Sequence, residues 1–246
     1  MDWGFRRNLQ LLTQNRVDPP ERFTYTTPVG AEFEGYVREL ISRSPDALYL
    51  FHVPEYTMWP GHWQAFEDVA YRNHLSPVLW KTYYQRDGKP VYEVYTLKPT
   101  PRVFEPPVMD HTLDVRLDER LALLGYDRPQ DEIKRGEDIR LTLYWKALAP
   151  LAANYKVFAH LLDDNGKLWG QHDDFPAYGS YPMTEWQPGE AVPDRIRIEL
   201  GADIPPGIYH VFVGMYDEST GKRLPLVLDG QRLKGDTLGL IDIKIE

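Results

Sequence analysis

The chain has 246 residues, of which 42% are hydrophobic and 26% charged, so its composition is that of a globular protein with one large domain or two ordinary ones. The net charge of −9 and the lack of clustered basic residues argue against nucleic acid as a partner, because phosphate binding needs a basic surface. The absence of cysteine excludes disulfides, thiolate metal sites and cysteine nucleophiles, and no apolar run of about 18 residues could span a bilayer.

Helical and strand patterns alternate in the first half of the chain. Apolar residues recur at helical spacing in three segments, 5–12, 33–41 and 63–70. Two segments have the length and composition of strands, 22–28 and 47–54, and the continuous apolar run of the second predicts burial on both faces. Asp87-Gly88 lies between two β-rich runs and predicts a hairpin. We therefore expect residues 1–100 to form an α/β domain, a small sheet with covering helices.

The second half begins after a proline-rich stretch. Because residues 98–110 hold four prolines and show no periodicity, the pattern predicts a linker over 101–110. Beyond it, apolar and polar residues alternate in four segments, 139–146, 155–162, 195–200 and 209–216. Each such strand has one apolar face, which needs a second sheet to cover it. We expect residues 111–246 to form an antiparallel β-sandwich, Ig-like or jelly-roll-like.

The sequence carries no recognisable catalytic constellation. It lacks the GxSxG elbow, the HExxH zinc motif and the glycine-rich loops that cradle phosphates. Glu55, Glu67 and Asp68 lie among aromatic residues, and a glycosidase uses paired carboxylates, but we interpret these three as solvated charges. We expect no catalytic residue and no cofactor in this chain, and no enzymatic activity of the chain alone.

A carboxylate-rich segment in the second half raises the question of a metal. Asp163, Asp164 and Asn165 are residue types that bind calcium, but the segment lacks the spacing and the distal glutamate of an EF-hand loop. Asn165-Gly166 between two strands instead predicts a hairpin turn of type I′. We interpret the segment as a turn and predict no metal site.

Aromatic residues are unusually frequent, with 7 Trp and 16 Tyr. Exposed aromatic rings are common platforms for sugars, because a flat π-face stacks on the C–H groups of the ring. The candidates for such stacking follow the apolar strand at 47–54 or lie in the long connection of the second half: Tyr56, Trp59, Trp63, Trp169, Tyr178, Tyr181 and Trp186. The alternative is that these side chains fill the interior of the protein.

Several strings in the chain resemble a known family. The strings in the second half are LLGYD at 123–127, LTLYW at 141–145, FAHLLD at 158–163 and the pair GMYD and TGKRLP between 214 and 225. Together with residues 48–95 they resemble the C-terminal region of large bacterial membrane glycosyltransferases, the multi-spanning GT-C enzymes of the dolichyl-phosphate-mannose type. The resemblance covers nearly the whole chain.

This resemblance implies a non-catalytic, extracytoplasmic region of a sugar transferase at the cell membrane. Its partners would be the membrane-embedded domain of the same polypeptide and a glycan acceptor, with no nucleic acid involved. Because the family's catalytic carboxylate lies between membrane helices, none can be assigned here. Two alternatives stay open: a structural or protein-interaction module without a sugar ligand, and a stand-alone hydrolase acting on carbohydrate.

Overall fold

The computed structural model of the protein describes residues 6–18, 30–44, 46–57, 61–128 and 132–246. Within these residues the chain forms three sheets and few helices, so it is rich in β-structure. Among the described residues, no helix is long and apolar enough to cross a membrane. The chain divides into two compact units, 1–100 and 101–246, and the boundary coincides with the start of the proline-rich segment.

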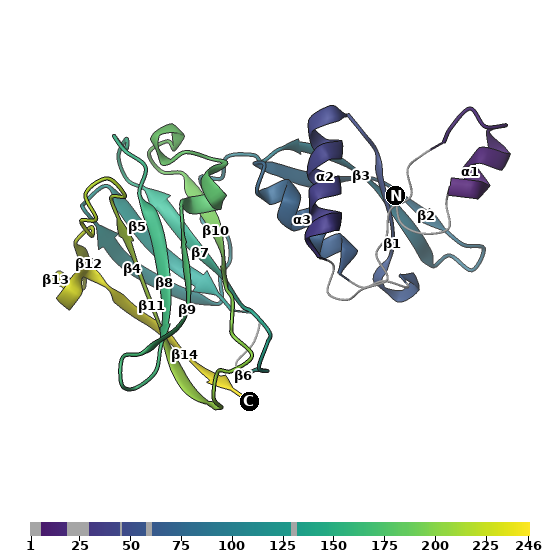
Figure 1. Ribbon diagram of the computed structural model, residues 1–246. Helices are drawn as coiled ribbons and strands as arrows, with labels where there is room; N and C mark the ends of the chain where they lie inside the picture. The colour runs from purple at the N-terminus through teal and green to yellow at the C-terminus, as the bar shows by residue number, and fades with distance from the viewer. Residues whose placement is uncertain (1–5, 19–29, 45, 58–60, 129–131) are drawn as a thin grey trace. The chain divides into compact units, whose positions relative to one another are not determined.

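The first unit combines helices with a three-stranded antiparallel sheet in the order β1-β3-β2 (Figure 1). Its elements in chain order are α1 (Arg6–Leu12), α2 (Ala31–Arg43), β1 (Tyr49–His52), η1 (Pro54–Tyr56), α3 (His62–Tyr71), β2 (Leu75–Tyr84) and β3 (Pro90–Pro99). The segment predicted as a strand at 22–28 lies outside the described residues.

Helices α2 and α3 bury their predicted apolar faces in one core. Phe33, Val37 and Ile41 of α2 meet Phe66 and Val69 of α3, together with side chains from β1 and β3. The helical spacing of these residues therefore predicted the buried faces correctly.

The expectation that the strand at 47–54 is buried on both faces was wrong. β1 lies at the edge of the sheet, pairs antiparallel with β3, and alternates buried Tyr49 and Phe51 with half-buried Leu50 and His52. An edge strand of an antiparallel sheet buries one face only, and a short apolar sequence does not distinguish this case from a central parallel strand.

The hairpin between β2 and β3 is confirmed at the predicted position. Gly88 has a positive φ of 83°, which glycine tolerates without a steric penalty. The carboxylate of Asp87 accepts a hydrogen bond from the backbone N–H of Lys89 at 3.1 Å. Gln85 N–H donates to the carbonyl of Lys89 and closes the loop.

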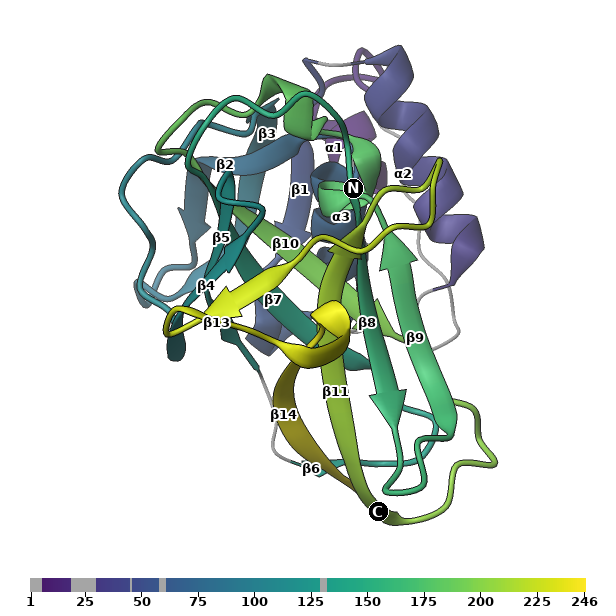
Figure 2. The same cartoon turned by 90° about the vertical axis from the view of Figure 1, so that its left-hand side faces the viewer.

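The second unit consists of two sheets, which form two layers (Figures 1 and 2). Their orders are β10-β7-β5-β4-β12-β13 and β6-β14-β11-β8-β9. The strands are β4 (His111–Leu117), β5 (Leu121–Asp127), β6 (Glu132–Ile133), β7 (Ile139–Ala147), β8 (Lys156–Leu162), β9 (Leu168–Asp174), β10 (Ala191–Ile198), β11 (Gly207–Tyr216), β12 (Leu226–Leu228), β13 (Gln231–Arg232) and β14 (Leu238–Ile245). Short 3-10 helices follow β9 (η2, Pro176–Gly179, and η3, Met183–Glu185) and β13 (η4, Lys234–Asp236).

The alternation that predicted β7, β8, β10 and β11 is confirmed by burial. Val157, Ala159 and Leu161 of β8 have no exposed surface, as expected for one inward face. Phe158 points to the other face, yet it is also buried, because the guanidinium of Arg223 lies 4.6 Å from the centre of its ring. The alternating pattern therefore identified the inward side chains but could not show that Arg223 covers the opposite face.

Part of the predicted linker is bonded to the second unit. The backbone N–H of Ala191 donates to the carbonyl of Val103 at 2.7 Å, and these two residues form an isolated β-bridge. The guanidinium of Arg102 contacts the buried carboxylate of Glu190 at 2.8 Å. These contacts fix the start of the 101–110 segment beside β10.

Candidate functional site

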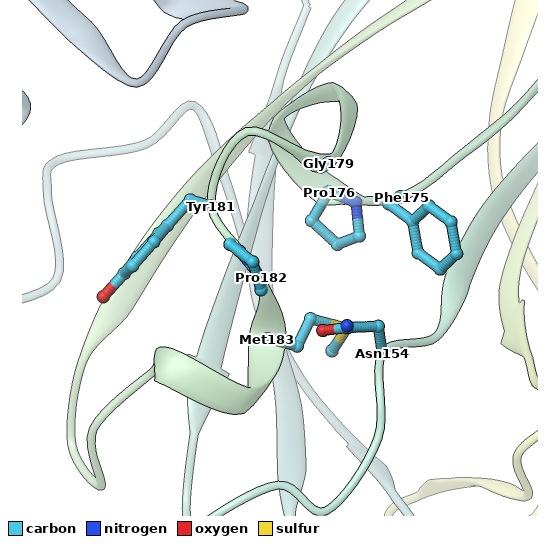
Figure 3. A pocket seen from close by; sticks show the side chains of 7 residues that line it. All are labelled: Asn154, Phe175, Pro176, Gly179, Tyr181, Pro182 and Met183. Carbon is cyan, nitrogen blue, oxygen red and sulfur yellow. The ribbon is translucent and has the colours of Figure 1, made fainter.

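The connection between β9 and β10 forms a small pocket on the second unit (Figure 3). It has a volume of about 190 Å³, and seven residues line it: Asn154, Phe175, Pro176, Gly179, Tyr181, Pro182 and Met183. We call it the ring pocket. Its walls are aromatic rings, prolines and a methionine, with one side-chain amide. Such a lining suits a ligand with an apolar face and at least one polar group.

One wall of the ring pocket is a left-handed turn. Ala177, Tyr178 and Gly179 all have positive φ, at 53°, 54° and 73°. The left-handed region costs roughly 1–2 kcal/mol for each residue that carries a Cβ. The carbonyl of Ala177 accepts hydrogen bonds from both the backbone N–H and the hydroxyl of Ser180, which close the turn. Two strained residues in sequence need support from the surrounding structure.

That support comes from Asp194, a buried residue of β10. The carboxylate is 1% exposed, and it accepts hydrogen bonds from the backbone N–H of Ala177 at 3.0 Å and from the indole N–H of Trp145 at 3.2 Å. Burial raises the pKa of Asp194 to about 6, against the opposing effect of both hydrogen bonds. Asp194 thus ties the strained turn to the core at the cost of burying a carboxyl group.

A second buried carboxylate holds the end of the loop. Glu190 is 1% exposed and accepts hydrogen bonds from the Tyr181 hydroxyl at 2.8 Å, the Gln187 N–H at 2.9 Å and the Arg102 guanidinium at 2.8 Å. The Arg102 guanidinium also lies 5.4 Å from the centre of the Tyr181 ring. Burial is the main reason that the pKa of Tyr181 is raised. This network fixes one aromatic wall of the pocket.

The opposite side of the ring pocket is held by the residues before β8. The Oδ1 of Asn154 accepts a hydrogen bond from Thr184 N–H at 3.3 Å, and the sulfur of Met183 accepts one from Tyr155 N–H at 3.3 Å. The ammonium of Lys156 lies 5.5 Å from the centre of the Phe175 ring. The pocket is therefore built by two segments that are bonded to each other.

The structure places the four predicted stacking aromatics of the second unit in different environments. Tyr181 and Trp186 are 6% and 3% exposed, and the indole N–H of Trp186 donates to the carbonyl of Tyr181. Because both rings are buried, neither can serve as an exposed platform for a sugar, and that prediction was wrong for Tyr181 and Trp186. Tyr178 is half-buried, edge-on to His172, and Trp169 is half-buried under the ammonium of Lys167, 3.5 Å from the ring centre.

The predicted aromatics of the first unit do not form a shared platform within the described residues. Trp63 packs on the core, with its ring centre 4.4 Å from that of Tyr95 and 5.2 Å from that of Phe51. Tyr56 is exposed, and its hydroxyl accepts a hydrogen bond from the Gln85 amide. Trp59 lies outside the described residues.

Glu67 and Asp68 do not face each other as the paired carboxylates of a hydrolase would. Glu67 and Asp68 are successive residues of helix α3, and successive helical side chains do not face each other. Glu55 lies in the 3-10 helix η1 and is exposed.

The segment with Asp163, Asp164 and Asn165 is a hairpin turn between β8 and β9, as expected. Only Gly166 has positive φ there, at 77°, so the predicted type I′ geometry was wrong. Asp163 accepts hydrogen bonds from the N–H groups of Asn165 and Lys167 and from the indole of Trp169. His210 bonds to Asp164 at 2.9 Å. In the described part of the chain, no group of three or more acidic or histidine residues has metal-binding geometry.

Removal of divalent metal should therefore leave the protein's stability unchanged. The oxygens of Asp163 already accept hydrogen bonds from the protein, so a calcium ion would have to displace them. We expect the same melting temperature with and without EDTA, measured by differential scanning calorimetry. A lower melting temperature in EDTA, restored by calcium, would reveal a metal site.

Several residues that build the ring pocket were not among the predicted candidates. Asn154 and Met183 carry no pattern that marks them. Asp194 does carry one, because it precedes Ile196 and Ile198 at a spacing of two and so belongs to the inward face of β10. A carboxylate at an inward position is a signal that sequence reasoning could have used.

The comparison with protein-family models gave no match, and the comparison with curated proteins gave none either. One similar solved structure is a Niemann-Pick type C2 protein from Japanese carpenter ant, with 9% identity and a TM-score of 0.27, covering 47% of this chain and 79% of that one. Another is the alkylpurine DNA glycosylase AlkC of Pseudomonas fluorescens, bound to DNA containing an abasic site analog. It has 14% identity and a TM-score of 0.27, and covers 55% of this chain and 31% of that one. At TM-scores this low, neither structure informs the fold or the function.

Proposed function

We propose that the chain is a non-catalytic accessory region of a membrane glycosyltransferase and that it binds a glycan in the ring pocket. In this proposal the first unit is an α/β domain and the second an antiparallel β-sandwich of the Ig-like or jelly-roll-like kind. Two layers of strands with inward apolar side chains, antiparallel except where β6 pairs parallel with β14, support that assignment for the second unit.

The observation that carries the proposal is the lining of the ring pocket. A sugar ring has an apolar face of C–H groups and a rim of hydroxyls. Half-buried Phe175 and Pro182 offer apolar surfaces for the face, and the amide of exposed Asn154 offers a hydrogen bond for the rim. Figure 3 shows the side chains of Asn154, Phe175 and Pro182 among those around the pocket. The lining matches both sides of such a ligand.

The same lining supports binding without catalysis. None of the seven lining residues is an acid, a histidine, a lysine or an arginine. The only titratable group among them is the Tyr181 hydroxyl, which donates to buried Glu190. Hydrolysis of a glycoside by general acid–base chemistry needs a pair of carboxyl groups facing the sugar ring, and the lining contains no carboxyl group.

The resemblance to GT-C enzymes supplies the biological setting of the proposal. The partner would be the membrane-embedded transferase domain of the same polypeptide, and the location would be the extracytoplasmic face of the cell membrane. The chain would then hold an acceptor glycan close to the catalytic domain.

Titration of the isotope-labelled chain with methyl glycosides of glucose, mannose and galactose tests the binding. We expect millimolar affinity for at least one sugar, with NMR shifts at Asn154, Phe175 and Met183. Phe175→Ala should weaken binding about two- to twelvefold, since an aromatic contact contributes roughly 0.5–1.5 kcal/mol. Tyr84→Ala, an exposed aromatic of the first unit, serves as the matched control and should bind like the wild type. Absence of binding by all three sugars would refute the glycan role.

A protein-interaction role is the second candidate, and one observation favours it. Val78, Leu79 and Trp80 of β2 are exposed by 44%, 50% and 58%, and β2 lies at an edge of its sheet. Exposed apolar edge strands are pairing surfaces. Self-association that Trp80→Lys abolishes, measured by analytical ultracentrifugation, would favour this role.

A further inference from the structure

The outer strand of the first unit carries a row of exposed, largely apolar side chains. Four large side chains of β2 are exposed: Val78, Leu79, Trp80 and Tyr84. In the described part of this unit, β2 lies at the edge of its sheet (Figure 1). Scattered exposed apolar residues are ordinary on a protein surface, but a contiguous group marks an interaction site. We call residues 78–89, the end of β2 and the turn that follows it, the hairpin arm.

The exposed apolar side chains lie on both faces of the hairpin arm. Val78 pairs with Thr96 of β3, and Leu79 pairs with Tyr95, the neighbouring residue of β3. Successive residues of a strand point to opposite faces, so one exposed apolar side chain lies on each face. A partner that docks on one face would cover only one of them, whereas a medium that surrounds the arm covers both.

The backbone of β2 is poorly suited to pairing with a further strand. Pro77 lacks an N–H, the register shifts between Leu79 and Lys81, and Lys81 places a charge on the edge. Proline, lysine and bulges are the features by which edge strands resist the addition of another strand. The side chains of the arm, rather than its backbone, are therefore its binding groups.

The charge of the hairpin arm is opposite to that of the whole chain. The chain has a net charge of −9, but residues 78–89 contain three basic residues and one acid. Lys81, Arg86 and Lys89 are exposed, and the carboxylate of Asp87 accepts the backbone N–H of Lys89. The ammonium of Lys81 lies 4.7 Å from the centre of the Tyr83 ring. The arm thus combines aromatic, aliphatic and cationic groups, which complements an anionic surface with an apolar interior.

We propose that the hairpin arm binds the interfacial region of a membrane that contains anionic lipids. Tryptophan and tyrosine are favoured at the level of the headgroups, where the apolar ring is buried and its polar atom stays hydrated. Val78 and Leu79 reach the boundary of the acyl chains on either side of the arm, and the three basic residues contact lipid phosphates. The binding involves neither the ring pocket nor a sugar, so it goes beyond the proposed glycan function.

Sedimentation of the chain with lipid vesicles tests the proposal. One kind of vesicle consists of phosphatidylcholine, and the other of phosphatidylcholine and phosphatidylglycerol in equal parts. The chain should bind the anionic vesicles more tightly, and added salt should weaken this binding, since salt screens the attraction between the arm and the headgroups. Phospholipids brominated in their acyl chains should quench the tryptophan fluorescence of the wild type more than that of Trp80→Phe.

Two variants of the arm are compared with matched variants of the second unit. Trp80→Ala should weaken binding about tenfold or more, because burial of an aromatic side chain contributes at least one factor of ten in affinity. Phe104→Ala removes an exposed aromatic ring outside the arm and should bind like the wild type. Arg86→Gln should weaken binding to the anionic vesicles about fivefold, the contribution of one basic residue near an anionic surface. Lys222→Gln, which removes an exposed cation elsewhere, should have no such effect.

The outcomes distinguish a membrane from a second copy of the chain. Absence of binding to both kinds of vesicle would overturn the proposal, and so would binding that Trp80→Ala and Arg86→Gln leave unchanged. A dimer that Trp80→Ala dissociates in analytical ultracentrifugation, together with no vesicle binding, would assign the arm to contact between copies instead. Arg86→Gln and the two kinds of vesicle decide the question even if Trp80→Ala does not fold. None of these results depends on sugar binding in the ring pocket.

Discussion

Replacement of Asp194 by asparagine is expected to remove the contribution of this carboxyl group to the pH dependence of stability between about pH 4 and about pH 7. The pKa of Asp194 is about 6 in the folded protein against an ordinary value of 3.8, because the carboxyl is buried. The folded state therefore binds the proton more tightly than the unfolded state. The stabilisation of the folded state by this tighter proton binding is fully present below about pH 4 and is lost as the pH rises through about 6.

The size of this effect follows from the difference between the two pKa values. The two pKa values differ by about two units, and each unit corresponds to about 1.4 kcal/mol. For this fully buried group, the free energy of unfolding should therefore fall by ~3 kcal/mol. Urea unfolding of both proteins at pH 4 and pH 7 measures it, because the difference between wild type and Asp194→Asn cancels the other titrating groups. A pH-independent difference would show that Asp194 keeps an ordinary pKa and that the account of its burial is wrong.

Gly125→Ala is expected to destabilise the second unit strongly, although it adds only one methyl group. Gly125 lies in β5, and a Cβ there would overlap the backbone carbonyl oxygen of His111 in β4 and the sulfur of Met109. Because the obstructing oxygen belongs to the backbone of the paired strand, the two strands must separate locally. We expect a loss of ~3 kcal/mol or more, at the upper end of overpacking effects.

A matched glycine in the same unit provides the control. Gly239 lies in β14, and a Cβ there would meet the Phe212 ring at 3.5 Å, an ordinary contact. Gly239→Ala should change the free energy of unfolding by less than about 1 kcal/mol. Chemical denaturation of both variants measures the difference. Similar stabilities for the two would contradict the close approach of β4 and β5 at Gly125.

The periodicity of apolar residues was sufficient to predict the helices and several strands. Phe33, Val37 and Ile41 lie at helical spacing, and Val157, Ala159 and Leu161 at strand spacing, so local sequence reports their burial directly. Strands β4, β5 and β14 were not predicted. In β5 nearly every residue is buried, which removes the alternation that marks a strand.

The candidate site was predictable only in part, because its construction is not local. Tyr178 and Tyr181 lie three residues apart, yet one is half-buried and the other is buried against Glu190. Ala177 and Tyr178 have no preference for a left-handed turn, so nothing in their own sequence predicts it. Asp194, which holds that turn, lies 17 positions away along the chain.

A crystal structure of the chain soaked with its best-binding methyl glycoside tests most directly whether the connection between β9 and β10 is a sugar site. We predict density for one sugar ring beside Phe175, within hydrogen-bonding distance of the Asn154 amide, with the Asp194 contact to Ala177 unchanged. A ring bound against Trp169 or on another surface, with the pocket filled by solvent alone, would contradict the account.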